Sequence, residues 1–367
     1  MKVFVLGTRG FPGVQGGVEK HCEELYPRLV KLGCEVVVCT RRSYIQHYKR
    51  IKQWQGVSYM HLWAPKKKNL EAIVHTFLGI IMARVNSIRI LHIHTVGPAI
   101  LTPFAKLLGI KVVFTHHGPD YQRKKWSKFA KVALRLGEFL GLKFADRVIA
   151  ISRTNKKFLE EKYERKGIVY IPNGVTLPQI EPGDEILKKY RLEPNRYVFT
   201  ACRFVPEKGL HDLVEAYKRI NNPELKLVIA GDADHETKYS RKLKKDAQDA
   251  GVVLTGFLSG KPLSELFSNA GLFVLPSYHE GMPIVLLEAL SYGLPLLVSD
   301  IPPNREISLP EFRYFKAGDI NDLSRKIQEL IKKGVSQAEK EAHREILDKD
   351  YNWDRIAEAT YNLFRAV

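Results

Sequence analysis

The chain of 367 residues has 45% hydrophobic and 27% charged residues, which excludes wholesale disorder and allows about two domains. Lys and Arg number 58 against 40 Asp and Glu, a formal net charge of +18. Residues 1–180 hold 31 of those cations and 11 of the anions, so the excess lies in the first half, where it should attract a polyanion, an anionic membrane or an acidic substrate.

Short apolar runs rich in β-branched residues alternate with amphipathic segments through the first half. Helices are predicted between most of these runs, for example over 18–32 and 124–144. Near-continuous apolar strands separated by helices are typical of a parallel sheet that is covered on both faces. The predicted strands are 2–7, 35–40, 57–62, 90–95, 111–115, 147–151 and 168–171.

Turn-forming residues cluster at 172–184, where we predict a linker, and the alternation then begins again. We predict an α/β fold of two doubly wound domains, 1–175 and 176–350, followed by an amphipathic packing helix over 351–367. In such sheets ligands bind beyond the carboxyl ends of the strands, so the active site is expected in a cleft between the domains. The second domain has predicted strands 197–201, 225–230, 252–255, 272–275 and 295–299 and predicted helices 209–220, 236–250, 262–269 and 283–292.

The cysteines and the apolar segments indicate a cytoplasmic protein. The four cysteines are scattered and form no C-x-x-C pair, which is typical of reduced thiols rather than of a disulfide framework or a zinc site. The N-terminal apolar run is too short for a signal peptide. The most hydrophobic stretch, 72–83, is too short to span a bilayer and contains His75.

Five glycines lie in residues 7–17, directly before a predicted helix, and the last two are Gly16 and Gly17. Glycine permits close approach of a ligand to the backbone, and a helix N-terminus presents N–H groups to an anion. The spacing is neither that of a dinucleotide fold nor that of a Walker A loop. We predict an anion or substrate loop, with a merely flexible loop as the alternative.

Two cations stand at the start of the second domain, Arg203 at a strand end and Lys208 just before a helix. Arg makes forked contacts with phosphate and Lys acts as a point charge, so the two could neutralise a diphosphate. The alternative is a pair of ordinary surface cations.

Residues 276–288 are predicted to run from a strand through a turn into a helix, with Pro283 in the first helical turn. Glu280 lies in the turn and Glu288 about two turns into the helix. A carboxylate can accept hydrogen bonds from the hydroxyls of a sugar or ribose. Backbone N–H groups at Met282, Ile284 and Val285 would suit phosphate.

A further candidate follows a strand of the first domain, in the sequence Thr115-His116-His117-Gly118-Pro119-Asp120. A histidine there can donate to a sugar hydroxyl or contact a phosphate. A purely structural histidine is the alternative.

Taken together, these elements resemble the retaining glycosyltransferases of family 4, which have the GT-B fold. A longer string, G-T-R-G-F-P-G-V-Q-G-G-V-E-K-H, resembles a bacterial subgroup that includes rhamnosyltransferases of surface-polysaccharide assembly. The matching elements are Glu280 and Glu288 as the E-x7-E pair, Arg203 and Lys208 as the cations on the nucleotide diphosphate, His117 as the sugar-contacting histidine, Gly16 and Gly17 as the N-terminal glycine loop, and Asn173-Gly174 as the segment between the domains.

The resemblance implies that the second domain binds a UDP-, GDP- or dTDP-sugar and the first domain the acceptor, with retention of configuration. It also implies that the C-terminal helix crosses back to the first domain. No cofactor or metal is expected: cations replace the ion, and Asp232-Ala233-Asp234 is a weak match to a metal motif. The expected roles are catalysis for His117, Arg203, Lys208 and Glu280, ribose binding for Glu288, recognition of the base near Gly256 and Phe257, further donor contacts at Gly281, Met282, Pro283, Ile284 and Val285, and acceptor contacts at His116 and Asp120.

The basic first half then suggests a polyprenyl-diphosphate-linked saccharide as acceptor and peripheral attachment to the anionic inner face of the cell membrane. A solvated helix face is the alternative for the basic helix. A nucleotide-sugar epimerase of the same fold and a nucleic-acid-binding protein are the alternative functions, although no recognised nucleic-acid module is present. The predicted contact regions are Arg41-Arg42, Lys49-Arg50, Lys66-Lys67-Lys68 and the helix with Arg123, Lys124, Lys125, Trp126, Lys128, Phe129 and Lys131.

Overall fold

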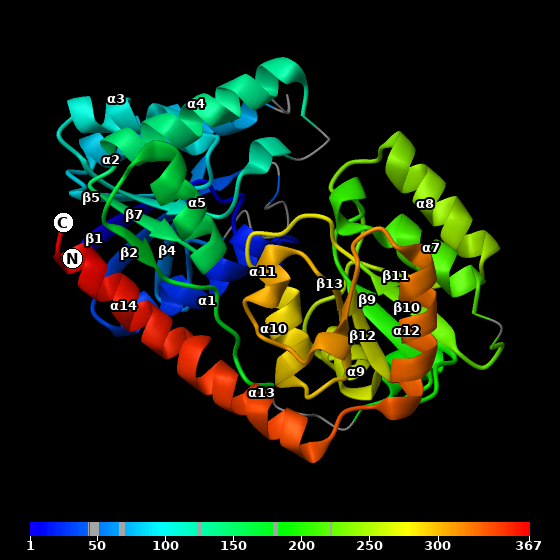
Figure 1. Cartoon of the computed structure of the whole chain (residues 1–367). Helices are drawn as coiled ribbons and strands as arrows, with labels where there is room; N and C mark the ends of the chain where they lie inside the picture. The colour runs from blue at the N-terminus through cyan, green and yellow to red at the C-terminus, as the bar shows by residue number, and fades with distance from the viewer. Residues whose placement is uncertain (43, 45–50, 66–69, 123–125, 179–182, 221) are drawn as a thin grey trace. The chain divides into compact units, whose positions relative to one another are not determined.

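The structure, a computed structural model, describes the chain except residues 43, 45–50, 66–69, 123–125, 179–182 and 221. It divides into two compact units. The first is made of Met1–Asn173 and Trp353–Val367, and the second of Gly174–Asn352. Each unit is an α/β layer structure with its own sheet (Figure 1), so the predicted fold class of two Rossmann-like domains is confirmed.

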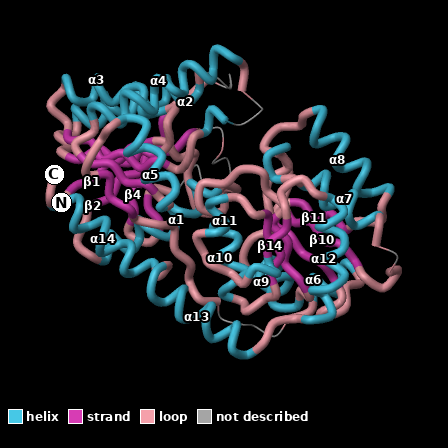
Figure 2. The backbone as a smooth tube through the Cα atoms, viewed as in Figure 1, coloured by secondary structure: helices cyan, strands magenta, loops and turns pink. Residues whose placement is uncertain are grey.

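The first unit has a sheet with strand order β3-β4-β2-β1-β5-β6-β7-β8, parallel throughout except for the antiparallel pair β3–β4. Figure 2 shows helices on both sides of these strands. The strands are β1 Lys2–Leu6, β2 Glu35–Arg41, β3 Gln53–Trp54, β4 Val57–Leu62, β5 Ile90–His94, β6 Lys111–His116, β7 Arg147–Ala150 and β8 Ile168–Tyr170. The helices are α1 Gly17–Lys31, α2 Glu71–Val85, α3 Thr102–Leu107, α4 Lys128–Phe144, α5 Arg153–Tyr163 and α14 Trp353–Arg365, with short 3-10 helices η2 Pro98–Leu101 and η3 Asp120–Gln122.

Alternation of side chains along β1 places apolar residues in two cores, one on each face of the sheet. Val3 and Val5 pack with α1 and α14, whereas Phe4 and Leu6 pack with α2, α3, α4 and α5. All four side chains are fully buried. A strand that is apolar on both faces therefore marks the centre of this sheet, as expected of a parallel sheet covered on both sides.

The second unit has an all-parallel sheet with order β11-β10-β9-β12-β13-β14. Its strands are β9 Tyr197–Ala201, β10 Lys226–Ala230, β11 Val253–Gly256, β12 Leu272–Leu275, β13 Leu296–Ser299 and β14 Tyr314–Phe315. Its helices are α6 Glu185–Tyr190, α7 Leu210–Lys218, α8 Lys238–Asp249, α9 Lys261–Asn269, α10 Ile284–Ser291, α11 Pro302–Arg305, α12 Ile320–Lys333 and α13 Gln337–Asp350, with 3-10 helices η4 Pro206–Lys208 and η5 Glu311–Arg313.

The predicted strands 57–62, 197–201 and 272–275 agree with β4, β9 and β12 at both ends. The predicted helices start one to four residues away from the observed ones, and two of these differences have a clear cause. The helix predicted over 124–144 begins at Lys128, because Ser127 caps it: the Ser127 hydroxyl accepts from the backbone N–H of Ala130 at 3.3 Å. Pro283 is the N-cap of α10 rather than a residue of its first turn. The helices α12 and α13 were not predicted.

The chain returns to the first unit through α14. Trp353, Ile356 and Phe364 are buried in the same core as α1, and Arg28 of α1 forms an ion pair with Asp354 at 2.9 Å. The predicted return of the C-terminal helix to the first domain is therefore correct. Among the described residues, no helix combines the length and the apolar composition needed to cross a membrane.

Candidate active site

The predicted site residues fall into two groups, one in each unit. In the second unit, β9 ends at Ala201 and places Arg203 and Lys208 in the following loop. Gly209 then turns the chain into α7 with φ of 64°, and a Cβ there would lie 2.0 Å from the carbonyl oxygen of Pro276. Glycine is therefore required where this loop passes close to the end of β12.

Both cations are paired with carboxylates. The Lys208 Nζ lies 2.5 Å from Glu280 Oε1, and the Arg203 Nη1 lies 2.8 Å from Asp234 Oδ2. The Lys208 and Glu280 side chains are only 17% and 9% exposed, so their pairing is shielded from solvent. Lys208 and Glu280, which were predicted to contact different parts of the ligand, thus contact each other. Asp234, which the sequence did not favour as a metal ligand, is here the partner of an arginine.

The loop after β12 holds Glu280 in place through neighbouring polar groups. The Ser277 hydroxyl donates to Glu280 Oε1 at 2.6 Å. This oxygen therefore accepts hydrogen bonds from both Ser277 and Lys208. The backbone N–H of Tyr278 donates to the carbonyl of Glu207 at 2.9 Å, which ties this loop to η4. Because β9 and β12 are adjacent parallel strands, their following loops meet at the same edge of the sheet.

The other predicted donor residues of the second unit lie on α10, in the loop before it and at the end of β11. Helix α10 begins at Ile284 with no side-chain cap, and Val285 and the half-buried Glu288 follow on it. Gly256 has φ of 73°, and its carbonyl accepts from Gly231 N at 2.7 Å. Phe257, the next residue, has a side chain that is 44% exposed. The predicted residues Gly281, Met282 and Pro283 form the end of the loop that leads into α10.

In the first unit, an ion pair holds the predicted glycine loop. The Arg9 Nε lies 3.1 Å from Glu19 Oε1, and the backbone N–H of Arg9 donates to the same oxygen at 3.2 Å. Burial would raise the pKa of Glu19, but the Arg9 charge and hydrogen bonds lower it below its usual value. Gly16, the N-cap of α1, has φ of 152°, and a Cβ there would lie 2.1 Å from Glu19 Oε2. Gly17 is the first residue of α1.

His116, predicted as an acceptor contact, is instead engaged inside the first unit through both ring nitrogens. Its side chain is fully buried at the end of β6. The Nε2 atom lies 2.9 Å from Glu138 Oε2, and Nδ1 lies 2.6 Å from Asn155 Nδ2. Burial would raise the pKa of Glu138, but hydrogen bonds, above all with His116, lower it to about 2. Asp120, the other predicted acceptor residue, is half-buried at the start of η3.

His117 is half-buried and touches a group of histidines that the sequence pattern did not bring together. His94 Nδ1 lies 2.9 Å from His117 Nε2, and the ring of His21 stands 5.0 Å from that of His117. The His21 Nδ1 donates to Asn173 Oδ1 at 2.8 Å, and its Nε2 has no hydrogen-bond partner within the part of the chain that the structure describes. One feature of the sequence could have indicated this group. His92 and His94 are two residues apart on a strand, so their side chains lie on the same face of the sheet.

Burial lowers the pKa of these histidines and keeps them neutral near pH 7. The pKa of His21 falls to about 4, although its hydrogen bond to Asn173 raises it, and that of His92 falls to about 3. For His94 and His117 burial also places the pKa well below the usual value. These groups therefore act in the folded chain as neutral hydrogen-bonding rings.

The stability of the chain should depend on pH because of these histidines. The unfolded chain binds more protons than the folded chain between pH 6.5 and about 4, so stability is complete above pH 6.5 and falls below it. Each histidine should lower the free energy of unfolding by up to about 1.4 kcal/mol per pH unit. Urea unfolding at pH 7.5 and 5 measures this. His21→Asn should give a shallower slope, and equal stability at both pH values would contradict the expectation.

The same cluster is the set of described residues best placed to hold a metal ion. Ligand atoms of His21, His94 and His117 lie within 4.8 Å of one another. Two imidazoles on one zinc ion, with Zn–N distances of about 2.0–2.1 Å, would have nitrogens about 3.3 Å apart in tetrahedral geometry. The 2.9 Å between His94 Nδ1 and His117 Nε2 is instead a hydrogen-bond distance. The arrangement is therefore a hydrogen-bonded chain that a metal would have to disrupt.

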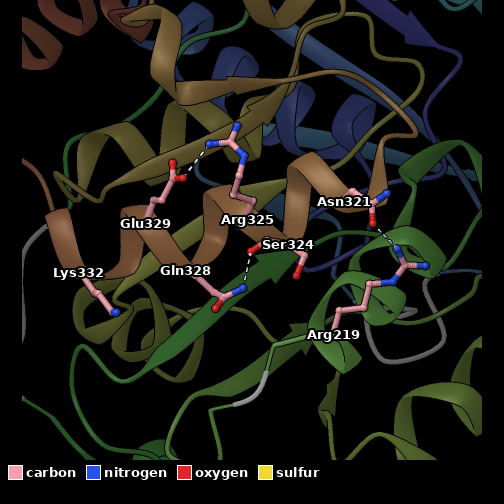
Figure 3. A pocket seen from close by; sticks show the side chains of 7 residues that line it. All are labelled: Arg219, Asn321, Ser324, Arg325, Gln328, Glu329 and Lys332. Atoms are coloured by element: carbon pink, nitrogen blue, oxygen red, sulfur yellow. Dashed lines mark hydrogen bonds and ion pairs between the residues drawn. The ribbon is translucent and has the colours of Figure 1, made fainter.

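A hollow on the surface of the second unit contains none of the predicted residues. Figure 3 shows three of its charged side chains engaged with neighbouring groups: Arg325 pairs with Glu329 at 2.7 Å, and Arg219 donates to Asn321 at 2.5 Å. These three charged groups thus already have partners within the hollow. Its lining residues are Arg219, Asn321, Ser324, Arg325, Gln328, Glu329 and Lys332.

The predicted membrane contacts differ in their exposure. Arg41 is 9% exposed and lies 3.6 Å from Glu71, so its prediction as a surface contact was wrong. Arg42 is exposed. The predicted contacts Lys49, Arg50, Lys66, Lys67, Lys68, Arg123, Lys124 and Lys125 lie outside the described residues.

Comparison with known protein families gives two matches that cover different parts of the chain. The family described as "Glycosyltransferase Family 4" matches residues 15–178, and the family described as "Glycosyl transferases group 1" matches residues 183–347. The boundary between these matches falls close to the division between the two units. The fold and the two family matches therefore agree along the chain.

Two curated relatives show the degree of sequence similarity. A UDP-Gal:alpha-D-GlcNAc-diphosphoundecaprenol alpha-1,3-galactosyltransferase of Escherichia coli is 33% identical over 258 residues, which are 66% of this chain and 65% of that enzyme. The uncharacterized glycosyltransferase YqgM of Bacillus subtilis is 30% identical over 195 residues, 52% of this chain and 53% of that protein. The chain thus matches less than two thirds of the length of each.

Solved structures resemble the chain over its whole length. A sucrose-phosphate synthase from Thermosynechococcus elongatus superposes with a TM-score of 0.83 at 20% identity, covering 100% of this chain and 98% of that one. Anabaena HepE, in complex with UDP and glucose, superposes with a TM-score of 0.80 at 17% identity, covering both chains completely. At these identities the likeness is one of fold.

Proposed function

Because the chain has a GT-B glycosyltransferase fold with a family 4 first half and a group 1 second half, we propose that it transfers a sugar from a nucleotide-sugar donor to a lipid-linked saccharide. The observation that carries this proposal is the pairing of Lys208 with Glu280 beside Arg203, at the carboxyl edge of the second sheet. These groups, together with the N-terminus of α10, offer positive charge to a diphosphate and a carboxylate to a sugar.

The proposed chemistry uses fixed cations in place of a divalent ion. Departure of the nucleoside diphosphate places negative charge on the leaving phosphate oxygens. Lys208 and Arg203 would stabilise that charge without reorganisation, because partner carboxylates already hold both side chains in position. We propose that the anomeric configuration is retained and that the leaving phosphate helps to deprotonate the acceptor hydroxyl. Transfer should then continue in EDTA.

The donor sugar is proposed to be a hexose or a 6-deoxyhexose. The resemblance of residues 7–21 to rhamnosyltransferases favours a deoxyhexose, whereas the E. coli relative is named as a galactosyltransferase. The same relative is named for a diphosphoundecaprenol-linked acceptor, which supports a lipid-linked saccharide here. Nucleotide release that depends on such an acceptor would distinguish transfer from epimerisation. The anomer of the product, read by NMR, tests retention.

Nucleoside diphosphates should stabilise the chain if the donor site is where we propose. Ligand binding at about 100 times its Kd adds about 2.7 kcal/mol to the free energy of unfolding. A thermal-shift series with UDP, GDP, dTDP and ADP should raise the melting temperature for at least one of them. Glu288→Gln should reduce that shift, whereas Glu329→Gln on the outer face of α12 should leave it unchanged. No shift with any diphosphate would contradict the donor site.

We also propose that α4 lies on an anionic membrane surface. Four apolar side chains at helical spacing are exposed along it: Phe129 at 89%, Val132 at 63%, Leu136 at 46% and Phe139 at 42%. The opposite face is packed against the unit, since a Cβ at Gly137 would lie 2.1 Å from the carbonyl oxygen of Val96. The polar side chains beside this stripe are basic, namely Lys128, Lys131, Arg135 and Lys143. An apolar stripe flanked by lysines suits the boundary between headgroups and acyl chains.

Substituting one of these aromatic residues should weaken vesicle binding. Burial of a phenylalanine side chain is worth about 1.5–3 kcal/mol, so Phe129→Ser should lower partitioning onto anionic vesicles at least about tenfold. Phe312→Ser, which removes a 36% exposed phenylalanine of the second unit, is the matched control and should have no effect. Co-sedimentation at low salt measures the partitioning. Equal binding to neutral and anionic vesicles would rule out the charged contact.

A further inference from the structure

A continuous chain of hydrogen bonds leads from the interior of the first unit to His117. Thr115 Oγ1 lies 2.7 Å from His92 Nε2, His92 Nδ1 lies 2.9 Å from Tyr26 Oη, and Tyr26 Oη lies 2.5 Å from His94 Nε2. His94 Nδ1 then lies 2.9 Å from His117 Nε2. Every member before His117 is at most 1% exposed. The chain joins α1, β5 and β6, which are fixed by the core of the unit.

The buried Thr115 hydroxyl sets the direction of these bonds, because its one hydrogen-bond partner among the described residues is His92 Nε2, to which it therefore donates. With oxygen acceptors, hydrogen bonds from O–H donors are typically about 2.7–2.8 Å long and those from N–H donors about 2.9–3.0 Å. The shorter bonds, 2.7 Å from Thr115 to His92 and 2.5 Å from Tyr26 to His94, fit hydroxyl donors. The two bonds of 2.9 Å, His92 to Tyr26 and His94 to His117, fit ring N–H donors.

All four hydrogen bonds can therefore have the same direction from donor to acceptor, leading from Thr115 to His117. A neutral imidazole has a single N–H, so His92 and His94, which accept at Nε2, donate from Nδ1. Tyr26 accepts one proton and donates its own, as a hydroxyl can. His117 then accepts at Nε2, and its own proton must reside on Nδ1. No buried donor or acceptor along this route is left without a partner, which such a buried network requires.

We propose that His94, oriented by Tyr26 and His92, is a positioning residue that fixes His117 in the tautomer with its proton on Nδ1. His117 then recognises the sugar nucleotide by donating a hydrogen bond to one of its oxygens. This part rests on the proposed function, because it requires a sugar nucleotide as the ligand. Other enzymes contain groups with a similar role. The hydrogen bond that one ring nitrogen of a histidine makes determines whether the other nitrogen carries the proton.

Nitrogen NMR of the chain labelled with 15N-histidine tests the tautomer directly, because protonated and unprotonated ring nitrogens differ strongly in chemical shift. The wild-type chain should show His117 protonated at Nδ1 and unprotonated at Nε2. His94→Asn keeps an N–H donor near the position of His94 Nδ1 and should preserve this pattern. His94→Asp offers only acceptor oxygens when ionised, so the His117 proton should move to Nε2.

Transfer kinetics give a second readout. His94→Asn should keep kcat/KM within about tenfold of the wild type, whereas His94→Asp should lower it about a hundredfold, mainly through a higher KM for the donor. Tyr197→Phe is the matched control: it removes a buried hydroxyl of the second unit, which donates to the Leu266 carbonyl at 2.6 Å, and should leave the His117 signals unchanged.

Two results would overturn the inference: a wild-type His117 protonated at Nε2, or a His94→Asp chain with the wild-type pattern. The NMR measurement on the wild-type chain needs neither a variant nor activity. If the chain shows the expected tautomer but transfers no sugar with any donor, the proposed function fails while the fixed tautomer stands. The two failures can therefore be told apart.

Discussion

Replacing Lys208 with alanine should lower kcat for sugar transfer by about a thousandfold. The Lys208 ammonium is held 2.5 Å from Glu280 and is only 17% exposed, so its charge acts where water screens it little. Removing one preorganised group that stabilises developing charge typically costs about 100–1,000-fold in kcat. The upper end is expected because Lys208 carries a full charge. Steady-state kinetics with a saturating donor measure the loss.

The matched control is Lys242→Ala, which removes a lysine of α8 that pairs with Asp246 at 2.6 Å on the surface of the same unit. This variant should transfer sugar at the wild-type rate. Both variants should melt within a few degrees of the wild type, because neither lysine belongs to the apolar core. A Lys208→Ala chain with wild-type kcat would remove this lysine from the mechanism.

Replacing Glu280 with glutamine should lower kcat/KM about a hundredfold. Glutamine keeps the size of the side chain and an oxygen that can accept from Ser277, but it removes the negative charge beside Lys208. Lys208 then loses the partner that holds it in place, and the sugar loses a carboxylate acceptor. Part of this loss is the same as the loss caused by Lys208→Ala, since the effects of substitutions at residues in contact are not additive.

A double-mutant cycle separates these effects. The chain with both Lys208→Ala and Glu280→Gln should be no more than about tenfold slower than Lys208→Ala alone. Glu224→Gln is the control, because Glu224 pairs with Arg196 away from the site and is 70% exposed. If the two losses simply multiplied, the ion pair would have no part in positioning the lysine.

The sheet could be predicted closely from the sequence because apolar, β-branched runs coincide with buried parallel strands. Helices α12 and α13 were missed although α12 has a clear apolar face, with Leu323, Ile327 and Leu330 buried at helical spacing. The many charged residues of 320–350 obscured that pattern. A helix needs apolar side chains on one side only, so a segment that is polar on the whole can still pack against a core.

The residues proposed for the candidate site could be picked out from the sequence, but the contacts between them could not. Lys208 and Glu280 are 72 residues apart, and they meet only because β9 and β12 are neighbours in the sheet. The local composition of the strands does not show which of them are neighbours in the sheet. Likewise, nothing in the adjacent pair His116 and His117 tells which ring turns toward Glu138, because that depends on where α4 packs.

The first unit is discontinuous, and this has a consequence for how the chain is made. Its core needs α14, whose Trp353 and Phe364 pack beside His21 and His92. These residues leave the ribosome after the whole of Gly174–Asn352, an uninterrupted unit that can close as soon as it has been synthesised. During translation the face of the first sheet that α1 and α14 share is therefore covered by α1 alone until α14 emerges, so the first unit is completed after the second.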